Sequence, residues 1–355
     1  MNRDRRRRSA RLGAHPERRV LTPGRRAALR RTAGRAGPAG DEGAVSPLPP
    51  QRRSRRRFVV LPPVVNMHAA PRPTSPVVSQ AILGTSVLVI RRSRGWALVV
   101  TPDRYRGWMR TPALRRDRRH MQVVEVRSLL ANVYAGQDVT TRAPIAVLPM
   151  LARVEISGAP APTLRAGGTS PRRASRVAGA AHEERGGVVG TSDWQRIHLP
   201  DGRTGWAQTA DLHPPVGKSG RRVLSRTTGR AAEIVATALR FVGLPYLWGG
   251  ITTFGLDCSG LVQLAHRAVG VVLPRDADLQ WADRRLSPVT PRGIRPGDLV
   301  FFGPRRGTIT HVGIAIGRRA FVNATTRRRP EVRIDRLDDP YWKKLFRGAR
   351  RLPGD

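Results

Sequence analysis

Cysteine and lysine are the residue types that this sequence has least of. Its 355 residues include one cysteine, Cys258, which excludes a disulfide within the chain and any metal centre held by several thiolates. No run of 18 apolar residues occurs, so we expect no transmembrane helix. Only three of the 65 Lys and Arg residues are lysine. The sequence therefore predicts domains that fold without disulfides, and we expect no metal and no cofactor.

The net charge of +40 at first favours a nucleic-acid partner. The charge is spread, however. Residues 1–66 hold 18 basic and 4 acidic residues, residues 67–230 hold 26 and 10, and residues 231–355 hold 21 and 11. Arginine almost without lysine also fits a bias toward GC-rich codons. We interpret the charge as compositional background and expect no specific nucleic-acid partner.

Residues 1–66 predict a disordered, arginine-rich extension, because they have almost no aromatic residues and no sustained apolar period. Residues 54–60 resemble a twin-arginine export signal, but the apolar stretch that follows is short and broken by two prolines. Translation starting at Met1 and translation starting at Met67 both stay open. The compartment stays open too: periplasm or cell envelope on one side, cytoplasm on the other.

An internal repeat occupies residues 77–212. Trp96 and Trp194 are each followed by a Pro-Asp pair and then by a Gly-Trp pair at the same offsets. Each unit alternates apolar and polar residues on both sides of a polar turn, which predicts two short strands. The repeat favours two small β-barrels that resemble bacterial SH3-like modules. We expect the first module to span residues 67–120 and the second to span residues 121–214, with a long insertion at 157–190.

The C-terminal third predicts an α+β domain over residues 231–355, after a linker at 215–230. Apolar residues at helical spacing predict one helix from about Ala231 and another from about Cys258. Three runs typical of strands follow the helices: 299–302, 311–316 and 320–323.

Cys258 is the candidate nucleophile. A thiol at the start of a helix meets free N–H groups and partial positive charge, which lower its pKa and favour the reactive thiolate. The same N–H groups suit an oxyanion. The alternative is that Cys258 is a small buried apolar residue. His266, two turns further along the same helix, is expected at the surface.

His311 is the candidate base, because it opens an apolar strand. If residues 317–319 form a three-residue loop, Ile316 pairs with Ala320. His311 and Asn323 then point to one face as diagonal neighbours. This places an amide where it can orient the imidazole, which predicts a Cys–His–Asn variant of the nucleophile–base–orienter arrangement.

Five motifs occur in the order found in the NlpC/P60 cysteine peptidases, and this third of the chain resembles that family. The resemblance implies a papain-like α+β fold and cleavage of the peptide stems of bacterial cell walls. It implies Cys258 as nucleophile, His311 as base, Asn323 as third residue where many members have histidine, and Tyr246 beside the nucleophile at the oxyanion. The motifs lie at residues 245–250, 257–262, 273–275, 296–302 and 311–314.

SH3-like modules ahead of such a domain narrow the resemblance to the γ-D-glutamyl-L-diamino acid endopeptidases. It implies that Asp257 and Ser259 hold the substrate's amine and D-Glu portion, and that Tyr105 of the first module closes the pocket. A carboxylate beside a thiolate is costly unless a cation accompanies it, and a substrate ammonium is one. The partners so implied are peptidoglycan stem peptides. We favour small fragments over intact sacculi.

Two other functions stay open. One is a wall-binding or nucleic-acid-binding protein with an inactive peptidase domain. The other keeps the fold and acts as an amidase or acyltransferase. The sequence decides neither between diaminopimelate and lysine stems nor the oligomeric state.

Overall fold

The computed structural model describes residues 57–157, 193–213 and 229–353. The expected insertion at 157–190 and linker at 215–230 lie almost wholly outside this range, as do residues 1–56 of the expected extension. None of the helices within these three stretches has the length and hydropathy needed to cross a membrane.

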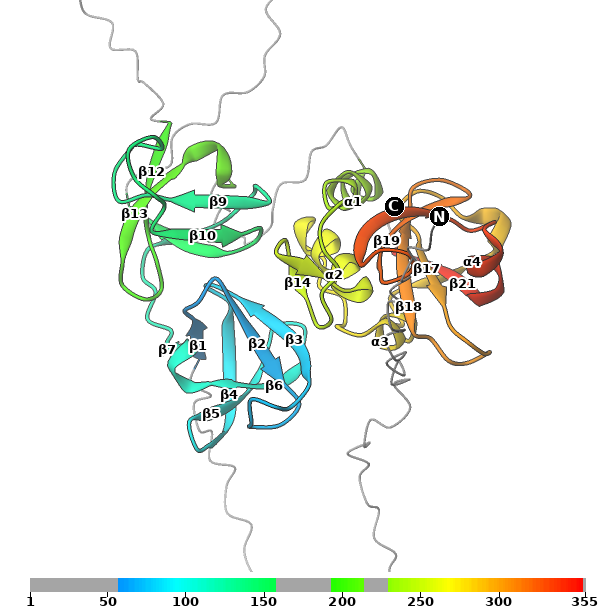
Figure 1. Ribbon diagram of the computed structural model, residues 1–355, viewed down its shortest axis with the longest axis horizontal. Coiled ribbons are helices and arrows are strands. Elements are labelled where there is room, and N and C mark those ends of the chain that lie inside the picture. The colour runs from blue at the N-terminus through cyan, green and yellow to red at the C-terminus, as the bar shows by residue number, and fades with distance from the viewer. Residues whose placement is uncertain (1–56, 158–192, 214–228, 354–355) are drawn as a thin grey trace, which may run out of the picture. The chain divides into compact units, whose positions relative to one another are not determined.

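The first module is a sheet of seven antiparallel strands, in the order β3-β2-β6-β5-β4-β1-β7 (Figure 1). Its core consists of the inward residues of these strands, among them Met67, Ala97, Val99 and Met109, each at most 1% exposed. The strands are β1 (Arg57–Val60), β2 (Val64–His68), β3 (Val77–Ile82), β4 (Ser86–Ser93), β5 (Trp96–Val100), β6 (Arg106–Arg110) and β7 (Leu114–Arg116).

This module begins earlier than the sequence indicated. Residues 57–60 form β1, which pairs with both β4 and β7, and Val59 and Val60 are fully buried. The boundary at residue 67 is therefore wrong, because β1 and the first three residues of β2 precede it. The end of the segment that resembles an export signal lies inside this sheet, and a chain beginning at Met67 lacks β1 and most of β2.

The second module repeats the hairpin of the first. Trp96 pairs with Arg110 across β5 and β6, and Trp194 pairs with Gln208 across the corresponding strands. It comprises a four-stranded sheet, β13-β12-β11-β8, and a two-stranded one, β10-β9. The strands are β8 (Gln122–Glu125), β9 (Leu130–Val133), β10 (Ala146–Pro149), β11 (Arg153–Ile156), β12 (Trp194–His198) and β13 (Thr204–Gln208).

The repeated Gly-Trp pair has a packing reason. A Cβ on Gly107 would lie 2.8 Å from the Cβ of Met67, and one on Gly205 would lie 2.6 Å from a methyl carbon of Val133. In both modules another strand crosses directly over the glycine, so no side chain fits there.

The third module is an α+β domain built on a six-stranded antiparallel sheet in the order β16-β21-β17-β18-β19-β20. Its fold class is the one expected. The helices are α1 (Arg230–Leu239), α2 (Cys258–Ala268), α3 (Ala277–Trp281) and α4 (Pro340–Leu345). The strands are β14 (Ile251–Thr252), β15 (Gly255–Leu256), β16 (Ser287–Val289), β17 (Leu299–Phe302), β18 (His311–Ala315), β19 (Ala320–Thr325), β20 (Glu331–Arg336) and β21 (Phe346–Arg351).

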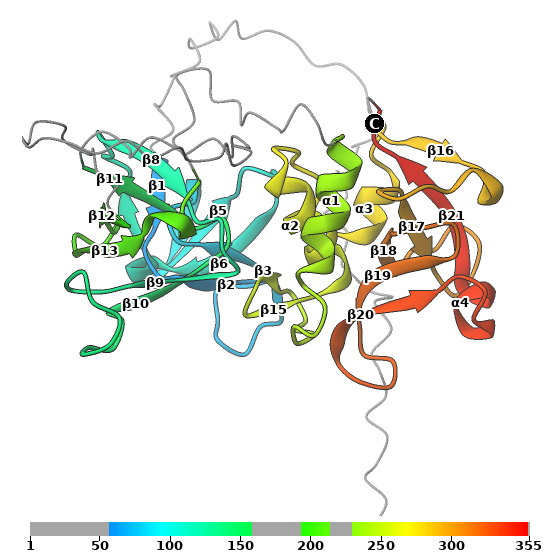
Figure 2. The same ribbon diagram turned by 90° about the horizontal axis from the view of Figure 1, so that it is seen from above.

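Both faces of this sheet are apolar, which explains the continuous apolar runs in its strands. Leu299 and Phe301 face the core shared with α1 and α2, whereas Val300 and Phe302 face a second cluster that contains Trp342 of α4. Figure 2 shows α1, α2 and α3 along one face of the sheet and α4 at the other. The helical layer presents the start of α2 to the sheet.

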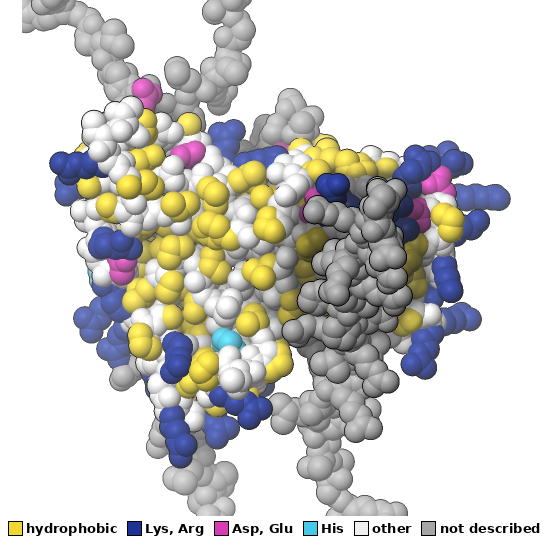
Figure 3. Space-filling model, viewed as in Figure 1, with side chains coloured by type: hydrophobic (Ala, Val, Ile, Leu, Met, Phe, Trp, Pro, Cys, Tyr) yellow, Lys and Arg dark blue, Asp and Glu magenta, His cyan; other side chains and the backbone are white. Residues whose placement is uncertain are grey.

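Basic side chains are scattered over the face of the molecule that Figure 3 shows. On the face drawn in Figure 3, Lys and Arg lie around the periphery and over more than one module. This distribution agrees with the interpretation of the charge as background.

Candidate active site

The start of α2 is shaped by its own sequence. The carboxylate of Asp257 caps the helix by accepting the backbone N–H of Gly260 at 2.7 Å. Gly260 is required here, because a Cβ would lie 2.0 Å from the carbonyl oxygen of Gly250. The expected helix start at Cys258 is therefore confirmed, and the preceding loop lies directly against it.

Cys258 is only partly exposed. Burial first, and then the charge of Asp257, raise the pKa of its thiol to about 12, although backbone N–H groups of Val312 and Ser259 act in the opposite direction. The expectation that the helix start lowers this pKa is wrong for the resting protein, because desolvation exceeds the effect of the helix. At neutral pH the resting group is a thiol.

His311 and Asn323 meet as the strand register predicted. Ile316 and Ala320 close the loop, with the N–H of Ile316 donating to the Ala320 carbonyl at 2.9 Å. The Nε2 atom of His311 lies 2.9 Å from Oδ1 of Asn323. Asn323 is fully buried, so this contact is held in place by the sheet.

The orientation of the Asn323 amide assigns the tautomer of His311. Its Nδ2 donates to Oδ2 of Asp335 at 3.1 Å and to the carbonyl of Arg333 at 3.3 Å. Oδ1 therefore faces the imidazole and accepts the proton on Nε2. Nδ1 of His311 is left with a lone pair that can accept a proton.

An aromatic wall holds the imidazole. The ring of His311 stacks on Trp342, with centroids 5.0 Å apart and 26° between the planes, and it also contacts Phe302. Burial lowers the pKa of His311 to about 4, opposed by the hydrogen bond to Asn323 and the charge of Asp335. The sequence analysis missed Trp342. Its helix start, Asp339-Pro340, was a signal that could have drawn attention to α4.

The start of β18 carries the His311 imidazole and also contacts the Cys258 thiol. Val312, which follows His311, directs its backbone N–H at the Cys258 thiol. Between the described side chains of Cys258 and His311 themselves there is no hydrogen bond. Such contacts are often long before substrate binds. The resting pair is thus a neutral thiol beside a neutral imidazole.

Tyr246 lies at the same place. It is half-buried and packs against the core cluster that Cys258 also touches. Burial, followed by the negative charges of Cys258 and Asp257, raises the pKa of its phenol well above the usual value. Tyr246 therefore stays protonated and keeps an O–H group to donate.

Asp257 and Ser259 already have a partner within the chain. Both are buried, and both bind the guanidinium of Arg275, which lies 2.6 Å from Oδ2 of Asp257 and 2.9 Å from Oγ of Ser259. The cation that the Asp257 carboxylate needs is therefore part of the chain. A substrate ammonium is therefore not needed to balance the Asp257 carboxylate in the resting protein, and the role of Asp257 and Ser259 in binding substrate stays a prediction.

Tyr105 of the first module is half-buried against the core of that module. It also lies close enough to Arg275 for its charge to influence the pKa of the guanidinium. Tyr105 thus lies near Arg275, and its role in closing the pocket stays a prediction.

His266 is a further difference from the sequence analysis. It is 1% exposed, not at the surface, and its Nδ1 lies 2.8 Å from the carbonyl oxygen of Val262. Burial lowers its pKa to about 4. The residue is part of the structural core of α2.

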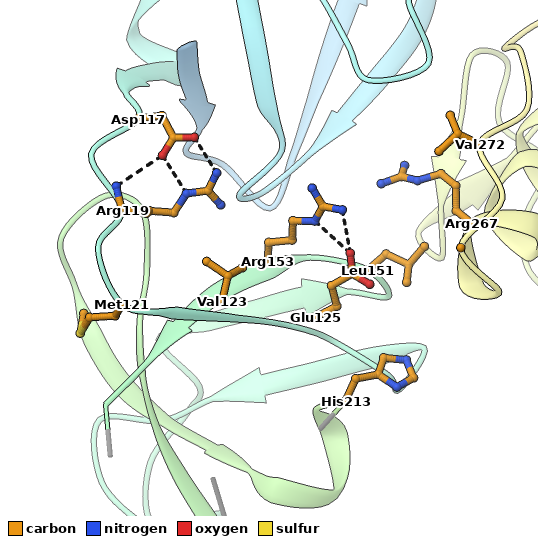
Figure 4. Close-up of a pocket in the computed structure, with 11 residues that line it drawn as sticks. Asp117, Arg119, Met121, Val123, Glu125, Leu151, Arg153, His213, Arg267 and Val272 are labelled. Atoms are coloured by element: carbon orange, nitrogen blue, oxygen red, sulfur yellow. Dashed lines mark hydrogen bonds and ion pairs between the residues drawn. The ribbon is translucent and has the colours of Figure 1, made fainter. Parts of the chain in front are cut away.

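A cavity of about 600 Å³ lies elsewhere, near the C-terminal end of α2 (Figure 4). Its lining includes two ion pairs, Arg119–Asp117 and Arg153–Glu125. Figure 4 shows Arg267 pointing in from α2. The expected site residues are not among those that line it, so cavity size does not mark the chemistry of this protein.

The fold and this arrangement define a papain-like α+β domain with a cysteine at the head of a helix and a histidine oriented by an amide. Residues 243–351 match the model of the NlpC/P60 family, and residues 67–114 match that of the bacterial dipeptidyl-peptidase Sh3 domain. The chain therefore carries an NlpC/P60 domain preceded by a bacterial SH3 domain.

Known relatives agree with this assignment. The chain is 40% identical over 135 residues to a gamma-DL-glutamyl hydrolase of Bacillus subtilis, covering 37% of this chain and 32% of that protein. It is 32% identical over 158 residues to a gamma-D-glutamyl-L-lysine dipeptidyl-peptidase of Bacillus cereus, covering 44% and 45%. The chain thus spans a third to a half of the length of these relatives.

A solved structure supports the fold over a longer range. An NlpC/P60 family protein from Bacillus cereus matches 83% of this chain and 99% of its own, with a TM-score of 0.63 and 20% sequence identity. At this identity the likeness concerns the fold, including the β-rich N-terminal part.

Proposed function

We propose that this protein is a cysteine endopeptidase that hydrolyses peptidoglycan stem peptides at the bond between γ-D-Glu and the diamino acid. The observation that carries the proposal is the 2.9 Å contact between His311 and Asn323, in a domain whose capped helix starts at Cys258. The names of the two Bacillus relatives, a gamma-DL-glutamyl hydrolase and a gamma-D-glutamyl-L-lysine dipeptidyl-peptidase, support this bond and substrate class.

The proposed reaction proceeds through a thioester. Nδ1 of His311 accepts the proton of the Cys258 thiol, and the sulfur attacks the γ-carbonyl carbon of D-Glu. The N–H of Ser259 and the O–H of Tyr246 stabilise the oxyanion. His311 then protonates the leaving amine as the C–N bond breaks, and water attacks the thioester to release the acid and regenerate the thiol.

Asn323 serves this reaction by holding the imidazole, and Asp335 serves it by holding Asn323. When His311 becomes an imidazolium, Oδ1 of Asn323 accepts its Nε2–H, and the carboxylate of Asp335 favours the positive charge. The resting His311 pKa of about 4 already includes both effects, which oppose the larger effect of burial.

We place the substrate's stem between the nucleophile and the first module. Tyr105 is the proposed substrate-facing residue of that module, because it lies near Arg275 and so near the residues flanking Cys258. Asp257 and Ser259, which flank the nucleophile and bind Arg275, remain the proposed contacts for the amine and D-Glu portion of the substrate. A binding site closed on one side by another module suits short fragments with a free N-terminal L-Ala better than it suits polymeric peptidoglycan.

The test is a mass-spectrometric assay with L-Ala-γ-D-Glu-diaminopimelate, the corresponding lysine peptide and intact sacculi. We expect release of L-Ala-D-Glu from the free peptides, and loss of this release in Cys258→Ala while peptide binding by calorimetry persists. His120→Gln, at an exposed position, is the matched control and should keep full activity. Turnover by Cys258→Ala would refute the mechanism.

The same assay separates the alternatives. Cleavage of a different amide or transfer of the acyl group to an added amine would identify an amidase or acyltransferase. Retention on DNA or on wall material that weakens with salt, without any cleavage, would identify a binding protein.

A further inference from the structure

The guanidinium of Arg275 connects the first module to both residues that flank Cys258. Its Nε donates to Oγ of Ser79 on β3 at 3.0 Å. Nη1 donates to Oδ1 of Asp257 and to Oγ of Ser259, each at 2.9 Å, and Nη2 donates to Oδ2 of Asp257 at 2.6 Å. The Arg275 side chain is 1% exposed. One buried cation thus binds a barrel residue and the residues on either side of the nucleophile.

This network needs an arginine. Guanidinium is a rigid plane with five donors, so one orientation serves Ser79 and both oxygens of Asp257 together. Asp257 in turn caps α2 through Gly260 and accepts the N–H of Gly249 at 3.0 Å. The position of the guanidinium therefore determines the position of the carboxylate at the start of α2.

The loop before the nucleophile also rests on β3. The N–H of Ile251 donates to Oε1 of Gln80 at 3.2 Å. A Cβ on Gly249 would lie 2.9 Å from a methyl carbon of Val77, which shows how closely the loop approaches the strand. Three residues of β3, Val77, Ser79 and Gln80, thus contact Arg275 or the segment that leads to Cys258.

We propose that Arg275 is a positioning residue that makes docking of the first module a condition for the reactivity of Cys258. The inference rests on the proposed function, because it assigns a use to the same nucleophile. Two effects act together. The charge of Arg275 offsets that of Asp257, which opposes formation of the thiolate. Ser79 fixes the plane of the guanidinium, so that this offset depends on the barrel.

The experiment measures alkylation of Cys258 by iodoacetamide, a reaction that needs no peptide substrate. Cys258 is the sole cysteine, so the mass increase of the full-length protein reports it directly. Rates are recorded from pH 6 to pH 10 for the wild type, Ser79→Ala, Arg275→Lys and Arg275→Gln. The matched control is Arg351→Lys, which alters the internal pair of Arg351 with Asp298 at the other end of the sheet.

We expect Arg275→Gln to slow alkylation at pH 7.5 by about tenfold or more, because one unit of thiol pKa is a factor of ten in thiolate. Its pH profile should move to higher pH. Ser79→Ala should slow the reaction by about threefold, in the same direction. Arg275→Lys keeps the charge, so its profile should move less than that of Arg275→Gln. Arg351→Lys should react like the wild type.

A merely structural role gives the opposite result. Loosening the region exposes the partly buried thiol and speeds its alkylation. Faster alkylation in Ser79→Ala and Arg275→Gln, unchanged rates in both, or equal slowing in Arg351→Lys would each overturn the inference. If Arg275→Gln does not fold, Ser79→Ala and Arg275→Lys still decide. A wild type that alkylates as expected but cleaves no stem peptide would overturn the proposed function and leave this inference standing.

Discussion

The buried His266 makes the stability of the protein depend on pH in a defined direction. Its pKa is about 4 in the folded chain and about 6.5 when unfolded. Between these values the unfolded state binds the proton and the folded state does not, so the free energy of unfolding falls as the pH falls through this window. Above pH 6.5 the imidazole is neutral in both states and this effect vanishes.

The size of the effect follows from the shift. Each pH unit within the window corresponds to about 1.4 kcal/mol, so His266 lowers the free energy of unfolding by about 2 kcal/mol between pH 7 and pH 5. The His266 side chain is 1% exposed, so solvent does little to reduce this change in the free energy of unfolding. The carboxylates are still largely ionised at pH 5, so they contribute little to the change.

The assay is urea denaturation followed by circular dichroism at pH 7 and pH 5. His266→Gln should lose about 2 kcal/mol less than the wild type between these two pH values. Any packing loss caused by the substitution cancels, because each protein is compared with itself. His120→Gln is the matched control at an exposed position and should behave like the wild type. An equal pH dependence in wild type and His266→Gln would refute the reasoning.

Three further predictions concern the site and the fold. Because the His311 pKa is about 4, kcat/KM on a free stem peptide should stay level from pH 6.5 down to about pH 5. A fall in kcat/KM centred near pH 6.5 would contradict the neutral resting pair. Asn323→Ala should reduce kcat by about 10²-fold with little change in KM, because the imidazole loses its orienting hydrogen bond. A chain starting at Met67 loses β1 and with it the burial of Val59 and Val60, so its free energy of unfolding should be lower by about 3 kcal/mol or more than that of a chain starting at residue 57, which keeps every described strand.

Local patterns accounted for much of the catalytic domain. The helix start at Cys258 follows from Asp257 as a cap and Gly260 as the residue that permits close approach. The pairing of His311 with Asn323 follows from a three-residue loop and the two-residue period of strands. Both depend on residues that are near one another in the sequence, where spacing alone decides which side chains share a face.

The first barrel shows where composition misleads. Residues 57–66 directly follow the arginine-rich segment, and their apolar run is interrupted by two adjacent prolines, which hid β1 and the start of β2. β1 is stabilised by pairing with β4 and β7, not by a pattern of its own. A strand of four residues carries too short an alternation to be recognised without its partners.

The sequence by itself determined the order of the modules, the nucleophile candidate and the register that orients the imidazole. Only the tertiary structure decided what surrounds them. Arg275 and Ser79 are 196 positions apart, yet they share a hydrogen bond, and Trp342 and Asp335 reach the site from α4 and β20. The pKa of the Cys258 thiol is opposite to what its place at the helix start indicated, and His266 is buried where the sequence indicated a surface position. The reason is physical: periodicity states which residues share a face, whereas desolvation and charge depend on what packs against that face.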